Sequence, residues 1–155
     1  MSGSIKHELP DLEAMSAWGE RIAQLVRPGD VIALEGGLGA GKTTLARAIL
    51  AGLGHEGEVP SPTFTIIETY DAPPLRVAVA HADFYRLEDP SEAVELGLDD
   101  YREGAVLLAE WPDHAGGFAH EASCLTIVLE SPGENRGEGR IATVKPGADW
   151  LGRLP

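Results

Sequence analysis

Two stretches of the chain place apolar residues at the spacing of a helix. In residues 11–26, apolar side chains recur every three or four positions with charged residues between them, as on one face of an amphipathic helix. The turn-forming residues 28–30 (PGD) end this pattern and predict a change of direction. A second helix is predicted from Lys42 to about Leu53, because glycines stand at and just after its end.

Two short apolar runs predict buried strands. Residues 31–34 (VIAL) lie between the PGD turn and a glycine-rich stretch, and residues 105–109 (AVLLA) form a similar run. Apolar runs of this length, bounded by turn residues, are typical of strands buried inside a sheet. The order strand, glycine-rich loop and helix is therefore predicted for residues 31–53.

Two further pairs of segments predict antiparallel hairpins. Residues 65–70 and 75–83 are rich in β-forming residues and are separated by the turn residues DAPP. Residues 124–130 and 140–145 predict two more strands, joined by a glycine-rich turn that holds Arg136. Together with the strand–loop–helix unit, these segments predict an α/β fold in which helices flank a mixed sheet. The order of the strands does not follow from the sequence.

The remaining segments predict little further structure. Asp89 is a candidate N-cap, with Pro90 at the first position of a short helix that runs to about Leu96. Because the chain has no repeats, low-complexity tracts or internal linkers, residues 1–155 are predicted to form a single domain. The segment after the last strand, residues 146–155, is expected to be a loosely held tail.

Composition narrows the functional classes. The chain has 155 residues and a net charge of −13, with 12 basic residues scattered among 25 acidic ones. Nucleic-acid binding depends on neutralisation of phosphates by Lys and Arg, so direct binding to DNA or RNA is not expected. The single cysteine, Cys124, excludes an internal disulfide. With no signal-peptide pattern and no apolar run of membrane length, we expect a soluble cytoplasmic protein.

The glycine-rich stretch fits the pattern G-x-x-x-x-G-K-[ST] at every fixed position. Glycines let the backbone wrap a phosphate with its N–H groups pointing inward, and the start of the following helix adds its positive dipole end. Lys42 supplies a charge for the terminal phosphates, and the Thr43 hydroxyl suits Mg²⁺. The flanking strand and helix disfavour a chance match, so we predict a P-loop that binds Mg-ATP or a close relative. The stretch reads Gly36-Gly37-Leu38-Gly39-Ala40-Gly41-Lys42-Thr43.

Two acidic residues stand directly after apolar runs. Asp83 and Glu110 end predicted strands, which is typical of a carboxylate delivered to the metal beside a P-loop, although either is equally explained as a solvated strand end. Residues 61–63 (SPT) lie where P-loop hydrolases often place a mobile switch, so Thr63 is a candidate sensor of the terminal phosphate or Mg²⁺. An ordinary turn is the alternative. Neighbouring residues left without a role are His81, Tyr85, Arg86 and Trp111.

Five motifs occur in a characteristic order. They are LGAGKTT (38–44), SPT (61–63), HxDxYR (81–86), GLDDY (97–101) and EWP (110–112). This ordered set resembles one family, the bacterial TsaE (YjeE) ATPases. The resemblance covers about residues 9–145 and is strongest between residues 31 and 112. The sequence departs from the family in having Gly37 where relatives often carry Asp, and Phe64 where Tyr is common.

This resemblance implies a particular function. The family's ATPases take part, with TsaB- and TsaD-type modification proteins, in the threonylcarbamoylation of adenosine 37 in tRNAs that read ANN codons. The ATPase is implied to be weak alone, to hydrolyse ATP in complex with the protein pair, and to meet tRNA only through that pair. Neither membrane association nor direct DNA binding is implied, and the implied cofactors are ATP and Mg²⁺.

The resemblance also implies roles for individual residues. Thr43 and Glu110 match the Mg²⁺ ligands of the family, and Asp83 is the other acid at the metal. Residues 9–11 (LPD) resemble a segment beside the adenine, and Arg140 resembles a late arginine near the nucleotide. The implied catalytic residues are Lys42, the switch residue Thr63, Asp83 and Glu110. The implied nucleotide-binding residues are Asp11, Gly37, Leu38, Gly39, Ala40, Gly41, Lys42, Thr43, Thr44 and Arg140.

Other functions would use the same loop. A small-molecule kinase needs an acceptor pocket and an arginine-rich lid, for which Arg136 and Arg140 are poor candidates. A regulatory GTPase would normally carry an Asn-Lys-x-Asp motif, which the sequence lacks. A scaffold that senses nucleotide without turnover is not excluded, because slow intrinsic hydrolysis is typical where a partner completes the site. The partner-dependent ATPase is the main prediction, and a small-molecule kinase or a nucleotide-sensing scaffold is the alternative.

Overall fold

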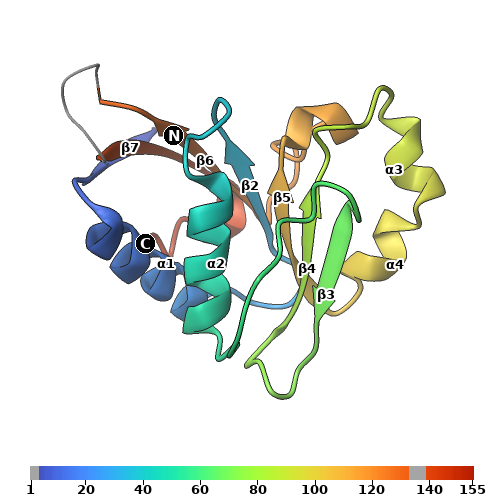
Figure 1. Ribbon diagram of the computed structural model, residues 1–155, viewed down its shortest axis with the longest axis horizontal. Coiled ribbons are helices and arrows are strands. Elements are labelled where there is room, and N and C mark those ends of the chain that lie inside the picture. Colours follow the sequence, from blue (N-terminus) through green and yellow to red (C-terminus); the bar gives the residue numbers. More distant parts are fainter. Residues whose placement is uncertain (1–3, 133–138) are drawn as a thin grey trace.

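The computed structural model describes residues 4–132 and 139–155 (Figure 1). Arg136, expected in the turn between the last two strands, lies outside the described residues. The described residues contain one sheet of seven strands in the order β1-β7-β6-β2-β5-β4-β3. The strands are β1 (Ile5–Leu9), β2 (Val31–Glu35), β3 (Ile67–Tyr70), β4 (Ala78–Asp83), β5 (Ala105–Glu110), β6 (Cys124–Glu130) and β7 (Arg140–Pro146).

The strands pair in both directions. β2 is parallel to both β5 and β6, and β5 is parallel to β4. The pairs β3–β4, β6–β7 and β1–β7 are antiparallel. The first two of these are the strand pairs that the sequence predicted as hairpins. The predicted α/β fold with a mixed sheet is therefore confirmed.

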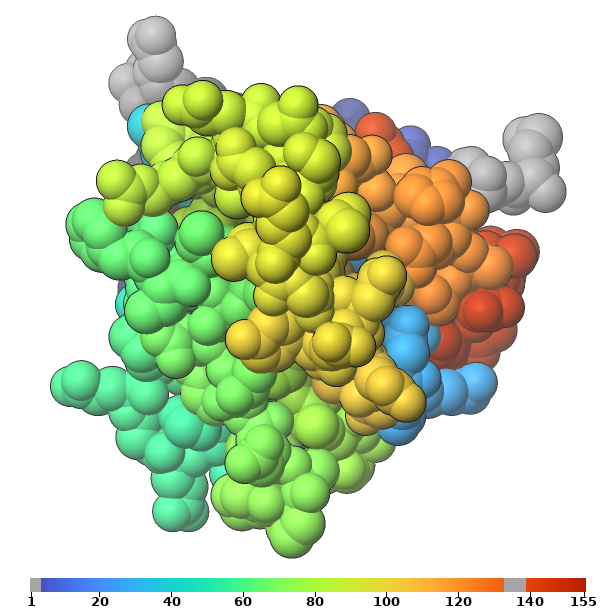
Figure 2. Space-filling view, turned by 90° about the vertical axis from the view of Figure 1, so that its right-hand side faces the viewer, coloured from blue at the N-terminus to red at the C-terminus, as the bar shows by residue number. Residues whose placement is uncertain are grey.

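Helices cover both faces of this sheet. α1 (Leu12–Leu25) and α2 (Lys42–Gly52) lie side by side on one face, and α3 (Ser91–Glu95) and α4 (Leu98–Arg102) lie on the other (Figure 1). Figure 2 shows α3 and α4, in yellow, across this second face. The short helices η1 (Pro112–Ala115) and η2 (Ala148–Trp150) follow β5 and β7. None of the helices in the described part of the chain combines the length and hydropathy that a membrane span requires.

Small residues allow α1 and α2 to pack closely. A Cβ atom added to Gly19 would lie 2.4 Å from the Cβ of Ala48, and one added to Gly52 would lie 2.7 Å from the Cβ of Ala23. Both distances are far below normal van der Waals contact, so any larger residue at either glycine would push the helices apart. This packing fixes α2, and with it the loop that precedes it, against α1.

The central strands are buried on both faces. In β2, Ile32 and Leu34 belong to the core beneath α1 and α2, whereas Val31 and Ala33 belong to the core on the α3 and α4 side. This alternation follows from the two-residue period of a strand, and burial on both faces explains the unbroken apolar runs in the sequence. The carboxyl ends of the parallel strands β2, β4 and β5 meet at one edge of the sheet, where α/β proteins commonly bind ligands.

Several element boundaries differ from the predictions. β1 and α4 were not predicted from the sequence. The expectation that Pro90 is the first helical residue is wrong by one position, because α3 begins at Ser91. The Asp89 carboxylate still accepts a hydrogen bond of 2.9 Å from the Ser91 backbone N–H, so it satisfies a donor at the start of the helix as a capping residue does.

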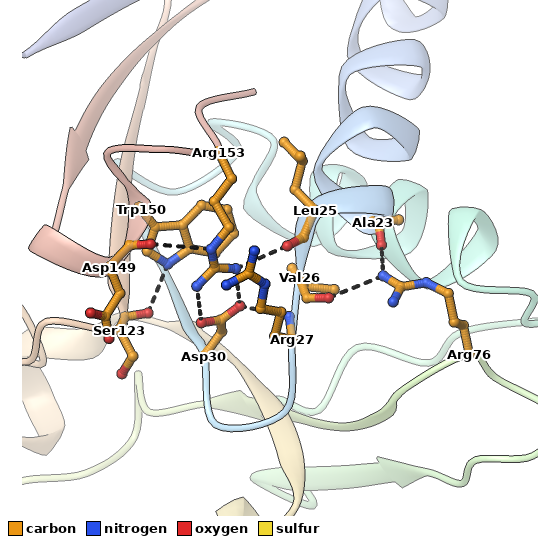
Figure 3. Close-up of polar contacts among 10 residues, drawn as sticks. All are labelled: Ala23, Leu25, Val26, Arg27, Asp30, Arg76, Ser123, Asp149, Trp150 and Arg153. Carbon is orange, nitrogen blue, oxygen red and sulfur yellow. Dashed lines mark hydrogen bonds and ion pairs between the residues drawn. The ribbon is translucent and has the colours of Figure 1, made fainter.

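The expectation of a loosely held tail at residues 146–155 is wrong. Trp150 is fully buried, and its Nε1–H donates to the carbonyl oxygen of Ser123 at 2.8 Å. The Arg153 guanidinium lies 4.0 Å from the centre of the Trp150 ring and donates two hydrogen bonds, of 2.6 and 2.7 Å, to the Asp30 carboxylate (Figure 3). Burial of a large aromatic ring and a paired charge offsets the entropy cost of ordering the segment.

Candidate functional site

The predicted phosphate-binding loop runs from the end of β2 into α2. Gly36, Gly39 and Gly41 have φ values of 145°, 74° and 104°, which L-residues with side chains rarely adopt. A Cβ atom on Gly36 would also lie 2.6 Å from the carbonyl oxygen of Leu129. Among the described residues, no side chain caps the first N–H groups of α2. These groups are therefore available to an anion at the helix start.

Lys42 is buried at the beginning of α2, with 5% of its surface exposed. Its Nζ donates to the carbonyl oxygens of Gly36 and Gly37, at 2.7 and 2.8 Å, and lies 4.3 Å from the centre of the Trp111 ring. Burial lowers the pKa of the Lys42 amine below its ordinary value, and the nearby Glu110 and Asp83 carboxylates partly offset this shift. The amine thus lies inside the loop, where a bound phosphate would meet it.

The two predicted acids lie side by side. β4 and β5 are parallel, and their register pairs Asp83 with Glu110. Both side chains are buried, with 6% and 2% of their surfaces exposed. The Thr43 hydroxyl donates to Glu110 Oε1 at 2.8 Å. The strand order thus brings the two carboxylates together, and one of them contacts the hydroxyl at the start of α2.

The predicted switch segment contacts the same acids. Thr63 Oγ1 donates to Asp83 Oδ2 at 3.2 Å, and the Ser61 and Thr63 hydroxyls are 2.8 Å apart. The other oxygen of Asp83, Oδ1, accepts from the backbone N–H of Tyr85 at 3.0 Å. Residues 61–63 are therefore tied to the metal-binding candidates through Asp83.

These groups line one cleft of about 320 Å³. Its walls come from α1, the glycine-rich loop, the switch segment and the ends of β4 and β5. The cleft brings all four predicted catalytic residues together. The residues that line it are Leu12, Met15, Leu38, Gly39, Ala40, Gly41, Lys42, Thr43, Thr44, Ser61, Thr63, Asp83, Glu110, Trp111 and Arg140.

Two of the predicted nucleotide contacts, Asp11 and Gly37, do not line this cleft. The Asp11 carboxylate accepts a hydrogen bond of 2.8 Å from a backbone N–H in the first turn of α1, and Leu12 lines the cleft beside it. Gly37 faces an adjoining cavity. Arg140 does line the cleft, and its guanidinium donates to two carbonyl oxygens of the glycine-rich loop at 3.0 and 3.1 Å.

Two residues without a predicted role contact the residues of the site. His81 is fully buried, and its Nε2 lies 2.6 Å from Glu110 Oε2. The available signal was its spacing, because residues two apart on a strand point to the same face, which put His81 on the side of Asp83. Trp111 has a left-handed backbone, with a φ of 54°. Its ring packs against the core on the α3 and α4 side and also faces the Lys42 amine.

The donor groups fit a nucleotide bound with Mg²⁺. Thr43, Asp83 and Glu110 present only oxygen atoms, which are the ligands that Mg²⁺ prefers. The Lys42 amine donates to two loop carbonyls and lies over the face of a ring. Among the described residues it forms no ion pair with a carboxylate that would compete with a phosphate. These residues would hold the metal and the terminal phosphates at the start of α2.

Comparisons with known proteins agree with this arrangement. A sequence model of the family described as "Threonylcarbamoyl adenosine biosynthesis protein TsaE" matches residues 9–140. A Haemophilus influenzae protein named tRNA threonylcarbamoyladenosine biosynthesis protein TsaE is 37% identical over 131 residues, covering 81% of this chain and 82% of that protein. A Bacillus subtilis protein of the same name is 48% identical over 100 residues, covering 64% of this chain and 61% of that protein.

One solved structure is also similar. The crystal structure of YdiB from Bacillus subtilis superimposes with a TM-score of 0.77 and 31% sequence identity. The superposition covers 96% of this chain and 89% of that one. The two chains therefore share the same overall fold.

Proposed function

The chain belongs to the TsaE family, and on that premise we propose that it is a Mg²⁺-dependent ATPase that assists the threonylcarbamoylation of adenosine 37 in tRNAs reading ANN codons. The observation that carries the proposal is the meeting of Lys42, Thr43, Asp83 and Glu110 in one cleft at the carboxyl edge of the sheet. A buried lysine, a hydroxyl and two carboxylates at this place are the parts that phosphoryl transfer requires.

The residues divide the work of hydrolysis. The Lys42 amine and the N–H groups at the start of α2 bind the β- and γ-phosphates of ATP. Thr43, Asp83 and Glu110 would hold Mg²⁺, directly or through water, and a bound metal would supply positive charge to offset the charge on the phosphates. Asp83 or Glu110 orients the attacking water. Thr63 connects the switch segment to Asp83, so movement of residues 61–63 reaches the acids.

The acidic composition supports an indirect relation to tRNA. The net charge of −13 opposes binding to a phosphate backbone, which depends on basic residues. We propose that it acts in the cytoplasm as a single domain of residues 1–155, docks on TsaB- and TsaD-type proteins, and meets tRNA through them. Its hydrolysis alone is expected to be weak until the partners order the switch segment. No observation on the described residues favours the small-molecule kinase or the nucleotide-sensing scaffold.

Reconstitution tests this function. The two cognate partner proteins, threonine, bicarbonate, ATP and unmodified tRNA are combined with the chain or with its Lys42→Ala variant. We expect many turnovers per modifying complex with the wild-type chain and about one with Lys42→Ala, because the variant loses the charge on the terminal phosphates. Lys6→Ala, a substitution of an exposed lysine on β1, is the matched control and should behave as wild type. Equal turnover with Lys42→Ala and wild type would refute the proposal.

A further inference from the structure

His81 is a buried polar side chain whose role the proposed function leaves open. It lies on β4 with 0% of its surface exposed, two residues before Asp83. Its Nε2 is 2.6 Å from Glu110 Oε2 on the neighbouring strand. Burial of a polar ring costs free energy unless its hydrogen-bonding groups are paired. The contact with Glu110 is therefore what offsets the cost of burying this histidine.

The hydrogen bond has a defined direction. Glu110 Oε2 is a carboxylate oxygen and only accepts, so the proton of the pair lies on His81 Nε2. The other ring nitrogen, Nδ1, has no hydrogen-bond partner among the described residues.

The two carboxylate oxygens of Glu110 accept hydrogen bonds from two different parts of the fold. Oε2 accepts from His81 of β4, and Oε1 accepts from the Thr43 hydroxyl at the start of α2, at 2.8 Å. A glutamate has three rotatable side-chain bonds, so two fixed contacts on its two oxygens define one orientation. The contact with His81 comes from the rigid sheet and is independent of the glycine-rich loop.

We propose that His81 is a positioning residue that fixes the Glu110 carboxylate toward Thr43 and thus toward the metal. Outer partners of metal-binding carboxylates commonly set the orientation of the ligand and the affinity for the metal. This inference rests on the proposed function, because it assigns His81 to the same Mg²⁺ site. It predicts that, without the Nε2–H donor, a higher Mg²⁺ concentration is needed to promote nucleotide binding. Binding of the nucleotide without metal should not change.

Two substitutions separate this role from simple packing. The amide nitrogen of His81→Gln reaches the place of Nε2, whereas the amide of His81→Asn reaches only the place of Nδ1. ADP binding is measured by calorimetry across a Mg²⁺ titration and again with EDTA, on the isolated full chain. For His81→Asn we expect an approximately tenfold higher Mg²⁺ concentration at half-maximal effect, equal to about 1.4 kcal/mol. His81→Gln should stay within about twofold of wild type, and binding in EDTA should be unchanged in both.

A double-mutant comparison gives an independent test. In a Glu110→Ala chain there is no carboxylate to position, so adding His81→Asn should change the Mg²⁺ dependence less than twofold. A purely structural effect of the substitution would persist in that background. If His81→Asn does not fold by circular dichroism, the folded His81→Gln variant decides alone, because a tenfold loss in it would overturn the role of the Nε2–H group.

The remaining outcomes are also decisive. The inference would be overturned if folded His81→Asn showed the Mg²⁺ dependence of the wild type. It would also be overturned if the Asn and Gln variants needed equally raised Mg²⁺ concentrations. Neither result would affect the proposed function. Absence of any Mg²⁺-dependent ADP binding by the wild-type chain would instead count against the proposed function itself. The two failures are therefore distinguished by the wild-type titration.

Discussion

Removal of the Arg153 guanidinium is predicted to destabilise the fold strongly, although the residue lies far from the cleft. Arg153→Met keeps most of the apolar stem and removes the charged group. Asp30 then loses both side-chain hydrogen bonds, of 2.6 and 2.7 Å, while only 3% of its surface is exposed. Among the described residues, the one hydrogen bond left to its carboxylate comes from the backbone N–H of Arg27, at 2.7 Å. The variant thus leaves a buried carboxylate without a counter-charge.

The size of the effect follows from these contacts. Breaking a buried ion pair by removing one partner costs about 3–5 kcal/mol. The lost hydrogen bond to the Leu25 carbonyl oxygen and the contact with the Trp150 ring add to this cost, whereas the retained Arg27 N–H reduces it. We therefore expect about 4 kcal/mol in the free energy of unfolding, or a fall of about 10 °C in Tm for a domain of this length.

Urea denaturation followed by far-UV circular dichroism measures this loss. Arg153→Lys is the matched control, since it keeps the charge but not the paired geometry, and should lose about 1–2 kcal/mol. Asp30→Asn combined with Arg153→Met should lose at least about 2 kcal/mol less than the sum of the single variants, because the uncompensated charge is absent. A loss below about 1 kcal/mol in Arg153→Met would refute the reasoning that this pair closes the C-terminal segment onto the core.

Three further predictions concern the loop, the metal site and the single thiol. Gly36→Ala should abolish tight ADP binding and lower stability by more than about 2 kcal/mol, as judged by calorimetry and urea denaturation, because its Cβ would lie 2.6 Å from the Leu129 carbonyl oxygen. Thr43→Ala should remove the Mg²⁺ dependence of ADP binding in a titration with and without EDTA, and retention of that dependence would contradict the metal assignment. Burial raises the pKa of the Cys124 thiol to about 11, from an ordinary value of 9.0. At pH 8 alkylation by iodoacetamide should therefore be about a hundredfold slower in the native chain than in urea. Because the folded pKa is the higher one, the associated stabilisation is present below about pH 9 and is lost as the pH rises toward 11.

The parts of the fold that depend on neighbours in the sequence were predictable. The glycine-rich loop, the strand before it and the helix after it form one local unit, whose chemistry demands glycines, a lysine and a hydroxyl at fixed spacing. The acids were predictable as strand ends. Their pairing was not, because it depends on β4 lying beside β5, and the sequence does not determine strand order.

The misses have physical causes. β1 consists mainly of polar residues, and only Ile5, His7 and Leu9 alternate toward the interior, where His7 packs 5.1 Å from the Trp18 ring. Such an edge strand carries half the apolar signal of a buried one. The tail was misjudged because Arg153 finds Asp30 at a separation of 123 residues, and no local pattern reports a partner that distant. For His81, the spacing on the strand indicated its face, but its contact with Glu110 depends on β4 lying beside β5.

The pairing of the first strand with the last one determines when the sheet can close during synthesis on the ribosome. The phosphate-binding loop is translated early. Among the described residues, however, β1 pairs with β7 alone, and the Asp30 carboxylate pairs with Arg153. At about 5–20 residues per second, the first strand spends on the order of ten seconds without its hydrogen-bonding neighbour. The nascent chain can therefore assemble its central parallel strands before its edge closes. Closure of that edge has to await synthesis of residues 140–153, which contain β7 and Arg153.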